Sequence, residues 1–383
     1  MSNLQKTVAE AFQLMADGLE SGKLAPAPRI ALTGMGSEHG EPNAIEAALA
    51  AQERGVHVVY IGSQEVEGLE CVHVDDDEAG HAKMVELLDA HEIDGAVTMH
   101  FPFPIGVSTV GRAVTPARGR EMLVATTTGT SSADLVEGMI LNAVYGVIAA
   151  KASGMSDPSV GILNVNGARQ CEMALKQLAD GGYPLRFAES SRADGGCVLR
   201  GNDVLQATAD VLVCDSLTGN VLTKMLSSYA TGGSFEAVGS GYGPGIGRGY
   251  DKLVLIVSRA SGVPVIANAL VYAGELVRNH VFDVSEQELA AADAAGLQEI
   301  LAARREASKP AAASEEVSAP PKEPVPSGIP GIDVMDLEDA VKVLWREKIY
   351  AESGMGCTGP IILTSEANHE CSIELLRKAG YVA

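Results

Sequence analysis

The chain has 383 residues, 46% of them hydrophobic, which is enough to bury one large core or two ordinary ones. Its 28 Lys and Arg residues and 50 Asp and Glu residues give a formal net charge of −22. Such a charge repels the phosphates of nucleic acids and anionic membrane surfaces. The totals therefore predict a soluble globular protein, with no nucleic acid and no membrane among its partners.

The sequence predicts neither a membrane-spanning segment nor an export signal. The longest apolar region, residues 253–277, is interrupted by Ser258, Arg259 and Pro264, so it lacks the roughly 20 uninterrupted apolar residues that cross a bilayer. The N-terminal residues mix acidic and apolar side chains at helical spacing and lack the apolar centre of a signal peptide. We expect a cytoplasmic protein.

The six cysteines are scattered along the chain and form no CxxC pair. A chain of this length does not depend on disulfides, so we expect reduced thiols. None of the eight histidines stands at zinc-ligand spacing from a cysteine, and the sequence predicts no metal site. The cysteines are Cys71, Cys171, Cys197, Cys214, Cys357 and Cys371.

Residues 1–28 predict an N-terminal helix, and residues 29–306 predict a large α/β body in which β-rich apolar runs alternate with helical patterns. This alternation predicts a parallel or mixed sheet with helices on both faces, in three α/β/α layers. The predicted strands are RIALTGM (29–35), HVVYIG (57–62), GAVTM (95–99), EMLVATTTG (121–129), VGILNV (160–165), ADVLVCD (209–215) and LVLIVS (253–258). The predicted helices cover 41–55, 78–91 and 132–154.

The composition changes after an alanine-rich helix that ends near Arg305. Residues 307–330 are rich in Pro, Ala and Ser and contain no aromatic residue, which predicts a flexible linker. Residues 331–383 regain periodicity and predict a small tethered unit. Its expected elements are a helix from about 336, a glycine loop over 352–360, a short strand over 361–364 and a helix over 366–378.

Four strand-to-helix junctions of the body carry glycines, hydroxyls and amides. Free backbone N–H groups and the helix dipole favour anions at such junctions, although each junction taken singly also fits ordinary helix capping. None matches GxxxxGK[ST] or GxGxxG, so we expect inorganic phosphate rather than a nucleotide, with Arg169 and Lys224 as its cations. The candidate phosphate or oxyanion residues are Gly34, Gly36 and Ser37 in TGMGSEHGEP; Gly129, Ser131 and Ser132 in TTTGTSSAD; Asn166 and Arg169 in NVNGARQ; and Thr218, Gly219, Asn220 and Lys224 in CDSLTGNVLTK.

Two other features of the body leave alternatives open. The run GSGYGPGIGRGYDK (239–252) has glycine at every second position from 239 to 249, which predicts either a mobile surface loop or a lid over a site. His39, in the first glycine loop, is either an acid or base or simply a solvated side chain.

Cys357, in ESGMGCTGP (352–360), is the candidate catalytic nucleophile. Gly354, Gly356, Thr358 and Gly359 predict a flexible loop that leaves its sulfur unshielded. The alternative is a flexible turn whose cysteine is merely small. A thiol on a tethered unit suits a carrier of a thioester, and phosphate held in the body could attack that thioester to release an acyl phosphate.

Four other cysteines are not candidates for the nucleophile. We expect them to behave as small, buried or partly buried hydrophobic side chains. They are Cys171, Cys197, Cys214 and Cys371.

Residues 125–221 resemble the bacterial phosphate acyltransferases, which make acyl phosphate from acyl carrier protein. The similarity lies in DPSVGILNVNG (157–167) and ADVLVCDSLTGNVLTK (209–224). TGMGSEHGEP (33–42) resembles the N-terminal glycine loop of that family without its aspartate. The resemblance implies a three-layer α/β/α fold of the phosphate acyltransferase and isocitrate dehydrogenase-like type.

The whole chain resembles the alpha subunits of component C of glycine, sarcosine and betaine reductase, through its body, its Pro/Ala linker and the terminal GMGCTGP (354–360). This resemblance implies that component A, a selenoprotein, carries a carboxymethyl group on selenium. Component C takes up the two-carbon unit as an acetyl thioester at the position of Cys357, and phosphate releases acetyl phosphate. Thioredoxin then reduces the mixed selenide-sulfide left on component A.

The same resemblance implies partners and cofactors. The expected partners are a component C beta subunit, component A and, indirectly, the thioredoxin system, in an oligomeric assembly. Inorganic phosphate is a co-substrate, and no tightly bound cofactor is expected. The family carries a further cysteine in the run matched by DGAVTMHFPFPIG (94–106), where Thr98 and His100 stand here, so we expect nothing essential at that place.

Two rival functions remain. One is a stand-alone acyl-phosphate synthase or phosphotransacetylase that uses acyl carrier protein or coenzyme A; it would need no thiol of its own, and Cys357 argues against it. The other is a non-catalytic scaffold that only carries acetyl. Arsenate-dependent breakdown of acetyl phosphate by the isolated chain separates an enzyme from a scaffold.

Overall fold

The structure is a computed structural model that divides into two compact units, Met1–Ala307 and Ser308–Ala383, here called the body and the C-terminal unit. The residues that it describes are 12, 15, 16, 18, 19, 27–191, 195–308, 317–330, 332, 337–356, 359–379 and 381–382. The predicted N-terminal helix over 1–28 therefore lies largely outside the described residues.

Within its described residues the body contains a 12-stranded sheet with the order β3-β2-β1-β4-β12-β11-β5-β6-β10-β7-β8, in which β9 also pairs with β7. The strands are β1 (Arg29–Thr33), β2 (His57–Gly62), β3 (Glu70–His73), β4 (Gly95–Thr98), β5 (Val107–Val114), β6 (Glu121–Thr130), β7 (Ser159–Leu163), β8 (Arg186–Phe187), β9 (Val198–Leu199), β10 (Val211–Val213), β11 (Gly243–Gly247) and β12 (Val254–Ile256). Each predicted strand overlaps one of these, and the predicted mixed α/β class is confirmed.

The sheet consists of two parallel sets joined by antiparallel strands. β1, β2, β3, β4 and β12 run parallel to one another, as do β6, β7, β8, β9 and β10. Between the two sets, β11 pairs antiparallel with both β12 and β5, and β5 pairs antiparallel with β6. The two parallel sets consequently run in opposite directions and meet at β11 and β5.

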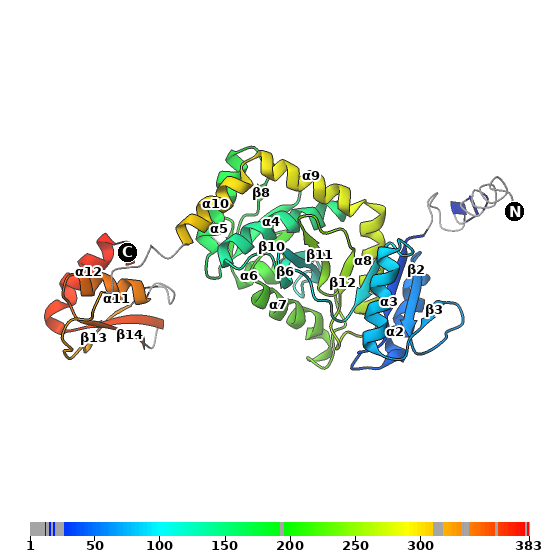
Figure 1. Cartoon of the computed structure of the whole chain (residues 1–383), viewed down its shortest axis with the longest axis horizontal. Coiled ribbons are helices and arrows are strands. Elements are labelled where there is room, and N and C mark those ends of the chain that lie inside the picture. Colours follow the sequence, from blue (N-terminus) through cyan, green and yellow to red (C-terminus); the bar gives the residue numbers. More distant parts are fainter. Residues whose placement is uncertain are drawn as a thin grey trace. The chain divides into compact units, whose positions relative to one another are not determined.

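Helices cover both faces of this sheet (Figure 1). Ile30 and Leu32 of β1 pack with α2 and α8, whereas Ala31 between them packs with α3. In β10, Val211 and Val213 pack with α4, and Leu212 packs with the side of α7. The helices are α2 (Glu41–Gln52), α3 (Asp77–Asp89), α4 (Leu135–Ala152), α5 (Ala168–Asp180), α6 (Gly201–Gln206), α7 (Ser216–Ser228), α8 (Val263–Arg278), α9 (Val281–Ala294) and α10 (Leu297–Ser308), with a 3₁₀ turn, η1 (Tyr229–Thr231).

One helix of the described chain, α4, is long and apolar enough to cross a membrane by length and composition. In the body it is a core helix, since residues along its whole length, such as Met139, Val144 and Ile148, are buried against the sheet and against neighbouring helices. Its apolar character is therefore explained by burial inside the protein.

The predicted loop or lid over residues 239–252 is wrong in its centre, because β11 (Gly243–Gly247) is a fully buried strand of the sheet. Glycine is required there by close approach: a Cβ at Gly243, where φ is +80°, would overlap the carbonyl oxygen of Val110 in β5. The glycines thus let a strand pass between β12 and β5, and their conformational freedom is not used for a mobile loop.

The C-terminal unit has its own three-stranded antiparallel sheet and its own core. Ile329, Leu344, Ile362 and Leu376 meet in that core. The strand order is β13-β15-β14. The elements are β13 (Ser327–Pro330), α11 (Leu337–Arg346), β14 (Ala351–Gly356), β15 (Gly359–Thr364), η2 (Glu366–Asn368) and α12 (His369–Lys378).

Two predictions for this unit need correction. Residues 327–330 were expected to end the linker, but they form β13, because Ile329 is buried opposite Ile362 of β15. The glycine loop expected over 352–360 is largely strand: β14 and β15 pair as far as Gly356 opposite Gly359. Cys357 and Thr358, which join these strands in the sequence, lie outside the described residues.

Candidate functional site

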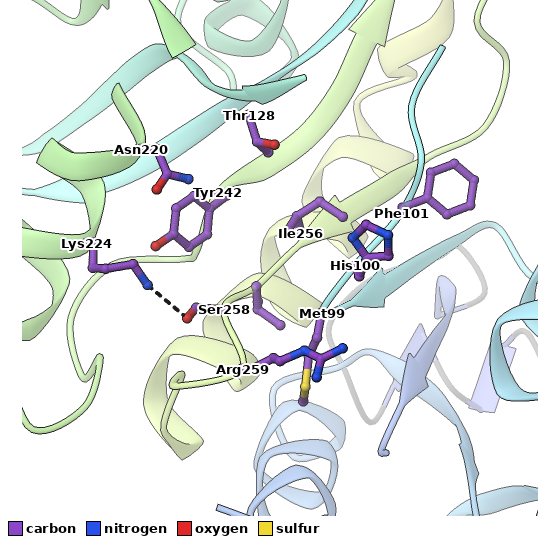
Figure 2. A pocket seen from close by; sticks show the side chains of 11 residues that line it. Met99, His100, Phe101, Thr128, Asn220, Lys224, Tyr242, Ile256, Ser258 and Arg259 are labelled. Carbon is purple, nitrogen blue, oxygen red and sulfur yellow. Dashed lines mark hydrogen bonds between the residues drawn. The ribbon is translucent and has the colours of Figure 1, made fainter. Parts of the chain in front are cut away.

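A pocket of about 370 Å³ opens in the body beside the carboxyl ends of β4 and β12 and the first turns of α7 (Figure 2). Parallel strands end and a helix begins at this place, which is where ligands collect in α/β sheets. The lining residues are Met99, His100 and Phe101 after β4, Thr128 in β6, Asn220 and Lys224 in α7, Tyr242 before β11, Ile256 in β12, and Val257, Ser258 and Arg259 after it.

Helix α7 brings two of the predicted residues to the pocket. Asp215 caps the helix by accepting hydrogen bonds from the Thr218 N–H at 2.9 Å and the Thr218 hydroxyl at 2.6 Å. Asn220 Nδ2 donates to the carbonyl oxygen of Thr127 at 3.1 Å and ties the helix to β6. Lys224 follows one turn later and reaches the same pocket.

The Lys224 ammonium is held in one place by three neighbours. Its Nζ lies 3.1 Å from Oε1 of Glu236 and 3.3 Å from the Ser258 hydroxyl, the contact drawn in Figure 2. It also lies 5.8 Å from the centre of the Tyr242 ring. Burial, followed by the charge and hydrogen bond of Glu236, raises the pKa of Tyr242 far above its usual range, so the phenol stays protonated and donates.

Arg259 supplies a cation without a local counter-charge. Within the described part of the chain its guanidinium has no hydrogen-bond or ion-pair partner, and its side chain is exposed. Its backbone carbonyl accepts from the Glu38 N–H at 2.8 Å, which braces the turn against the first glycine loop. A guanidinium in this position can bind an oxyanion with two parallel hydrogen bonds.

Polar donors and apolar side chains line different parts of this pocket. Figure 2 shows Lys224, Asn220 and Thr128 on one side and the apolar ring of Phe101, next to the polar ring of His100, on the other. Such an arrangement can hold a small anion through its cations and amide while an adjacent short apolar group contacts the opposite wall.

The first glycine loop does not line the pocket. The Gly34 N–H donates to the Ile61 carbonyl at 2.8 Å, and a Cβ at Gly34 would overlap Tyr60, so this glycine serves close packing. Gly36 has a φ of +91°, and the Ser37 hydroxyl accepts from the His39 N–H at 3.1 Å. These residues shape the turn, and the His39 ring contacts Phe235 edge-on with 5.8 Å between ring centres.

Residues of the second predicted junction, TTTGTSSAD (126–134), line two different cavities of the body. Gly129 follows Thr128 of the pocket in β6 and has a φ of +78°. Ser131 instead lines a separate cavity of about 310 Å³ and donates to the Ser108 hydroxyl at 2.7 Å. Ser132 accepts from the Asp134 N–H at 3.2 Å near the start of α4.

The third predicted junction, NVNGARQ (164–170), does not line the pocket. Gly167, with φ of +80°, precedes α5, and Asn166 comes just before it. Arg169 is exposed on α5 and forms an ion pair with Glu172 at 2.7 Å. At the fourth junction, Gly219 permits the close approach of α7 to Thr126. The structure therefore gathers Asn220 and Lys224 but not Arg169.

The described cysteines differ in accessibility. The predicted burial of Cys171, Cys197 and Cys214 is confirmed. Burial raises the pKa of Cys197 to about 11 and those of the other two further. The expected burial of Cys371 is wrong: α12 turns Ser372 and Leu376 inward and leaves this thiol exposed. The proposed nucleophile, Cys357, lies outside the described residues.

The sequence reasoning missed Arg259, Ser258, Tyr242 and Glu236. A signal for the first two was present, because SRASG (258–262) follows an apolar strand and precedes a helix, like the four junctions that were chosen. Tyr242 and Glu236 belong to no strand-to-helix junction, and they join the site through side-chain contacts with each other and with Lys224 that only the fold creates.

Comparisons of the sequence relate this chain to two groups of known proteins. A family described as "Fatty acid synthesis protein" matches residues 28–363. The chain is 54% identical over 385 residues to the glycine/sarcosine/betaine reductase complex component C subunit alpha of Peptoclostridium acidaminophilum, with 100% of both chains covered. It is 28% identical to a phosphate acyltransferase of Thermus thermophilus, over 53% of this chain and 72% of that protein.

A solved structure, a putative 4-hydroxythreonine-4-phosphate dehydrogenase from Salmonella typhimurium, shows 10% identity and a TM-score of 0.39 over 66% of this chain and 100% of its own, too low to define the fold. The sequence matches are decisive, because they extend over the body and, for the Peptoclostridium protein, over the entire chain. The chain belongs to the fatty acid synthesis protein family and, within it, to the component C alpha subunits of glycine/sarcosine/betaine reductase.

Proposed function

We propose that the chain accepts an acetyl group as a thioester on Cys357 and releases it as acetyl phosphate, as a component C subunit of a glycine, sarcosine or betaine reductase. The observation that carries this proposal is the full-length similarity to a component C alpha subunit, at 54% identity. The acetyl group would come from the carboxymethylated selenoprotein, component A.

The pocket of the body supports the phosphate step. Arg259 and Lys224 would bind the oxygens of inorganic phosphate, and Asn220 and Thr128 would supply uncharged donors nearby. One phosphate oxygen attacks the thioester carbonyl carbon, the C–S bond breaks, and the Cys357 sulfur leaves as a thiolate. The charge that develops on the carbonyl oxygen in the transition state is stabilised by the same fixed donors.

Of the six cysteines, Cys357 is the one that we assign to the carrier role; Cys71 is half-buried, and its sulfur accepts from the Val66 N–H at 3.3 Å. Cys171, Cys197 and Cys214 are buried, and their raised pKa values keep them protonated near neutral pH. Cys371 is exposed on α12 and serves as the natural comparison in any labelling experiment.

The remaining expectations belong to the same proposal. The body takes the phosphate acyltransferase type of three-layer fold, the Pro- and Ala-rich residues before β13 link it to the sheet of β13, β14 and β15, and the protein acts in the cytoplasm. Its partners are a component C beta subunit and component A, with thioredoxin acting indirectly. Inorganic phosphate is the co-substrate, and no tightly bound cofactor is needed.

The similarity to phosphate acyltransferases favours one rival, a stand-alone acyl-phosphate synthase or phosphotransacetylase that uses acyl carrier protein or coenzyme A. Incubation of the isolated chain with acetyl phosphate and arsenate separates the two functions. The carrier function predicts breakdown of acetyl phosphate without added thiol and its loss in Cys357→Ala. Activity that requires acyl carrier protein or coenzyme A and survives in Cys357→Ala would support the rival. No breakdown under any of these conditions would indicate a non-catalytic scaffold.

A further inference from the structure

Glu236 is a buried carboxylate beside the pocket, and the proposed reaction does not use it directly. The residue is 1% exposed. Its Oε1 accepts from Lys224 Nζ at 3.1 Å and from the Tyr242 hydroxyl at 3.0 Å, and its Oε2 accepts from the Ser261 hydroxyl at 3.2 Å. Both oxygens are thus occupied, which disfavours a role as a general base.

The backbone around Glu236 is tied to the turn that forms the pocket wall. The Glu236 N–H donates to the Ala260 carbonyl at 3.0 Å, and the Gly262 N–H donates to the Glu236 carbonyl at 2.8 Å. Ser258 is held in the same turn, because its N–H donates to the Ser261 hydroxyl at 3.0 Å. The carboxylate is consequently fixed relative to Ser258, the second contact of the Lys224 ammonium.

We infer that Glu236 is a positioning residue of the phosphate pocket. It holds the Lys224 ammonium against Ser258 and offsets its charge, so that Arg259 supplies the net positive charge that attracts the anion. A buried carboxylate at 3.1 Å is the partner that most strongly orients a half-exposed ammonium. The inference rests on the proposed function, since it takes the ligand of this pocket to be phosphate.

The chain contains a matched control for this network. Glu288 accepts from Lys151 Nζ at 2.6 Å and from the Tyr183 hydroxyl at 2.9 Å, the same three residue types in the same roles. This second trio lies between α4, α9 and the turn after α5 and does not line the phosphate pocket. Glu236→Gln and Glu288→Gln therefore remove equivalent charges, one of them beside the pocket.

The test measures phosphate binding by titration calorimetry and acetyl phosphate release from the acetylated full-length chain. Glu236→Gln should bind inorganic phosphate about three- to tenfold more tightly at low ionic strength, because the Lys224 charge is no longer offset. It should release acetyl phosphate at least about tenfold more slowly, because the ammonium is no longer held in place. Glu288→Gln should match the wild type in both measurements.

Tighter binding together with slower release is a combination that general destabilisation does not produce. Unchanged or weaker phosphate binding by Glu236→Gln, with normal binding by the wild type, overturns this inference alone. No phosphate binding by the wild type overturns the proposed function as well. If Glu236→Gln does not fold, Glu236→Asp withdraws the carboxylate from Lys224 and should bind about twofold more tightly; unchanged or weaker binding again refutes the inference.

Discussion

Gly219 of α7 and Thr126 of β6 lie so close together that a Cβ atom at position 219 would overlap the Thr126 carbonyl oxygen. This approach seats the helix on the strand and brings Asn220 and Lys224 to the pocket. Gly219→Ala should therefore destabilise the body by about 1–3 kcal/mol, measured by urea unfolding, and also weaken phosphate binding by displacing α7.

Gly201, at the start of α6, provides the control. A Cβ there would meet no atom within 4 Å, and its φ lies outside the left-handed region. Gly201→Ala should leave both stability and phosphate affinity close to those of the wild type. Equal effects of the two substitutions would contradict the close helix–strand contact as the cause.

Substitutions of Arg259 and Arg169 test whether phosphate binds in the pocket lined by Lys224 or at the start of α5, where the sequence predicted a cation. Arg259→Ala should weaken phosphate binding by at least about tenfold, because it removes the cation that lacks a local counter-charge in the described chain. Arg169→Ala should change phosphate binding little, since that side chain is exposed and paired with Glu172. Calorimetric titration with phosphate checks both, and the reverse order of effects would favour the α5 junction.

The sequence predicted most of the sheet because buried parallel strands are continuous apolar runs, as in HVVYIG and LVLIVS. It predicted no strand at β3, β5, β8 or β9. At β11 it predicted a loop, since glycine and proline have low strand propensity and this strand is specified by the space between β12 and β5. Tertiary packing, which no local pattern records, decided the structure there.

The candidate site was predicted in part for a similar reason. Asn220 and Lys224 follow a strand and open a helix, and this local pattern places them beyond the carboxyl end of β10. Whether Arg169 or Arg259 reaches the same pocket depends on the order of the strands, which residue spacing does not give. Glu236 joins through contacts to Lys224 and Tyr242 that only the folded chain creates.

The buried cysteines should resist alkylation. Burial raises the pKa of Cys197 to about 11 and holds Cys171 and Cys214 even more strongly in the thiol form, so their thiolate fraction is very small at pH 8. Under native conditions iodoacetamide should modify Cys371 first among the described thiols, as mapped by peptide mass spectrometry. Rapid labelling of Cys214 in the folded chain would refute this order.

Asp203 should contribute to acid sensitivity. Burial alone would raise its pKa, but N–H groups of Arg200 and Ser191 and the Ser190 hydroxyl donate to the carboxylate and hold the pKa below 3.8. Because the pKa is lower in the folded state, this stabilisation is present above pH 3.8 and is lost as the pH falls through the folded pKa.

Asp203→Asn should accordingly destabilise the body by about 1–3 kcal/mol at pH 7, and the difference from the wild type should shrink at pH values below 3.8. Denaturant unfolding at pH 7 and at about pH 3.5 measures both values. A difference that stays constant between these two conditions would show that the carboxylate charge is not involved.

The most direct measurement of the central claim follows one acetyl group on the intact chain. The protein is incubated with acetyl phosphate, the bound acetyl is located by peptide mass spectrometry, and phosphate is then added. We predict an acetyl adduct on the peptide that contains Cys357, unchanged in Cys371→Ala, and its conversion to acetyl phosphate only when phosphate is present. An adduct on another cysteine, or one that phosphate does not remove, would contradict the account.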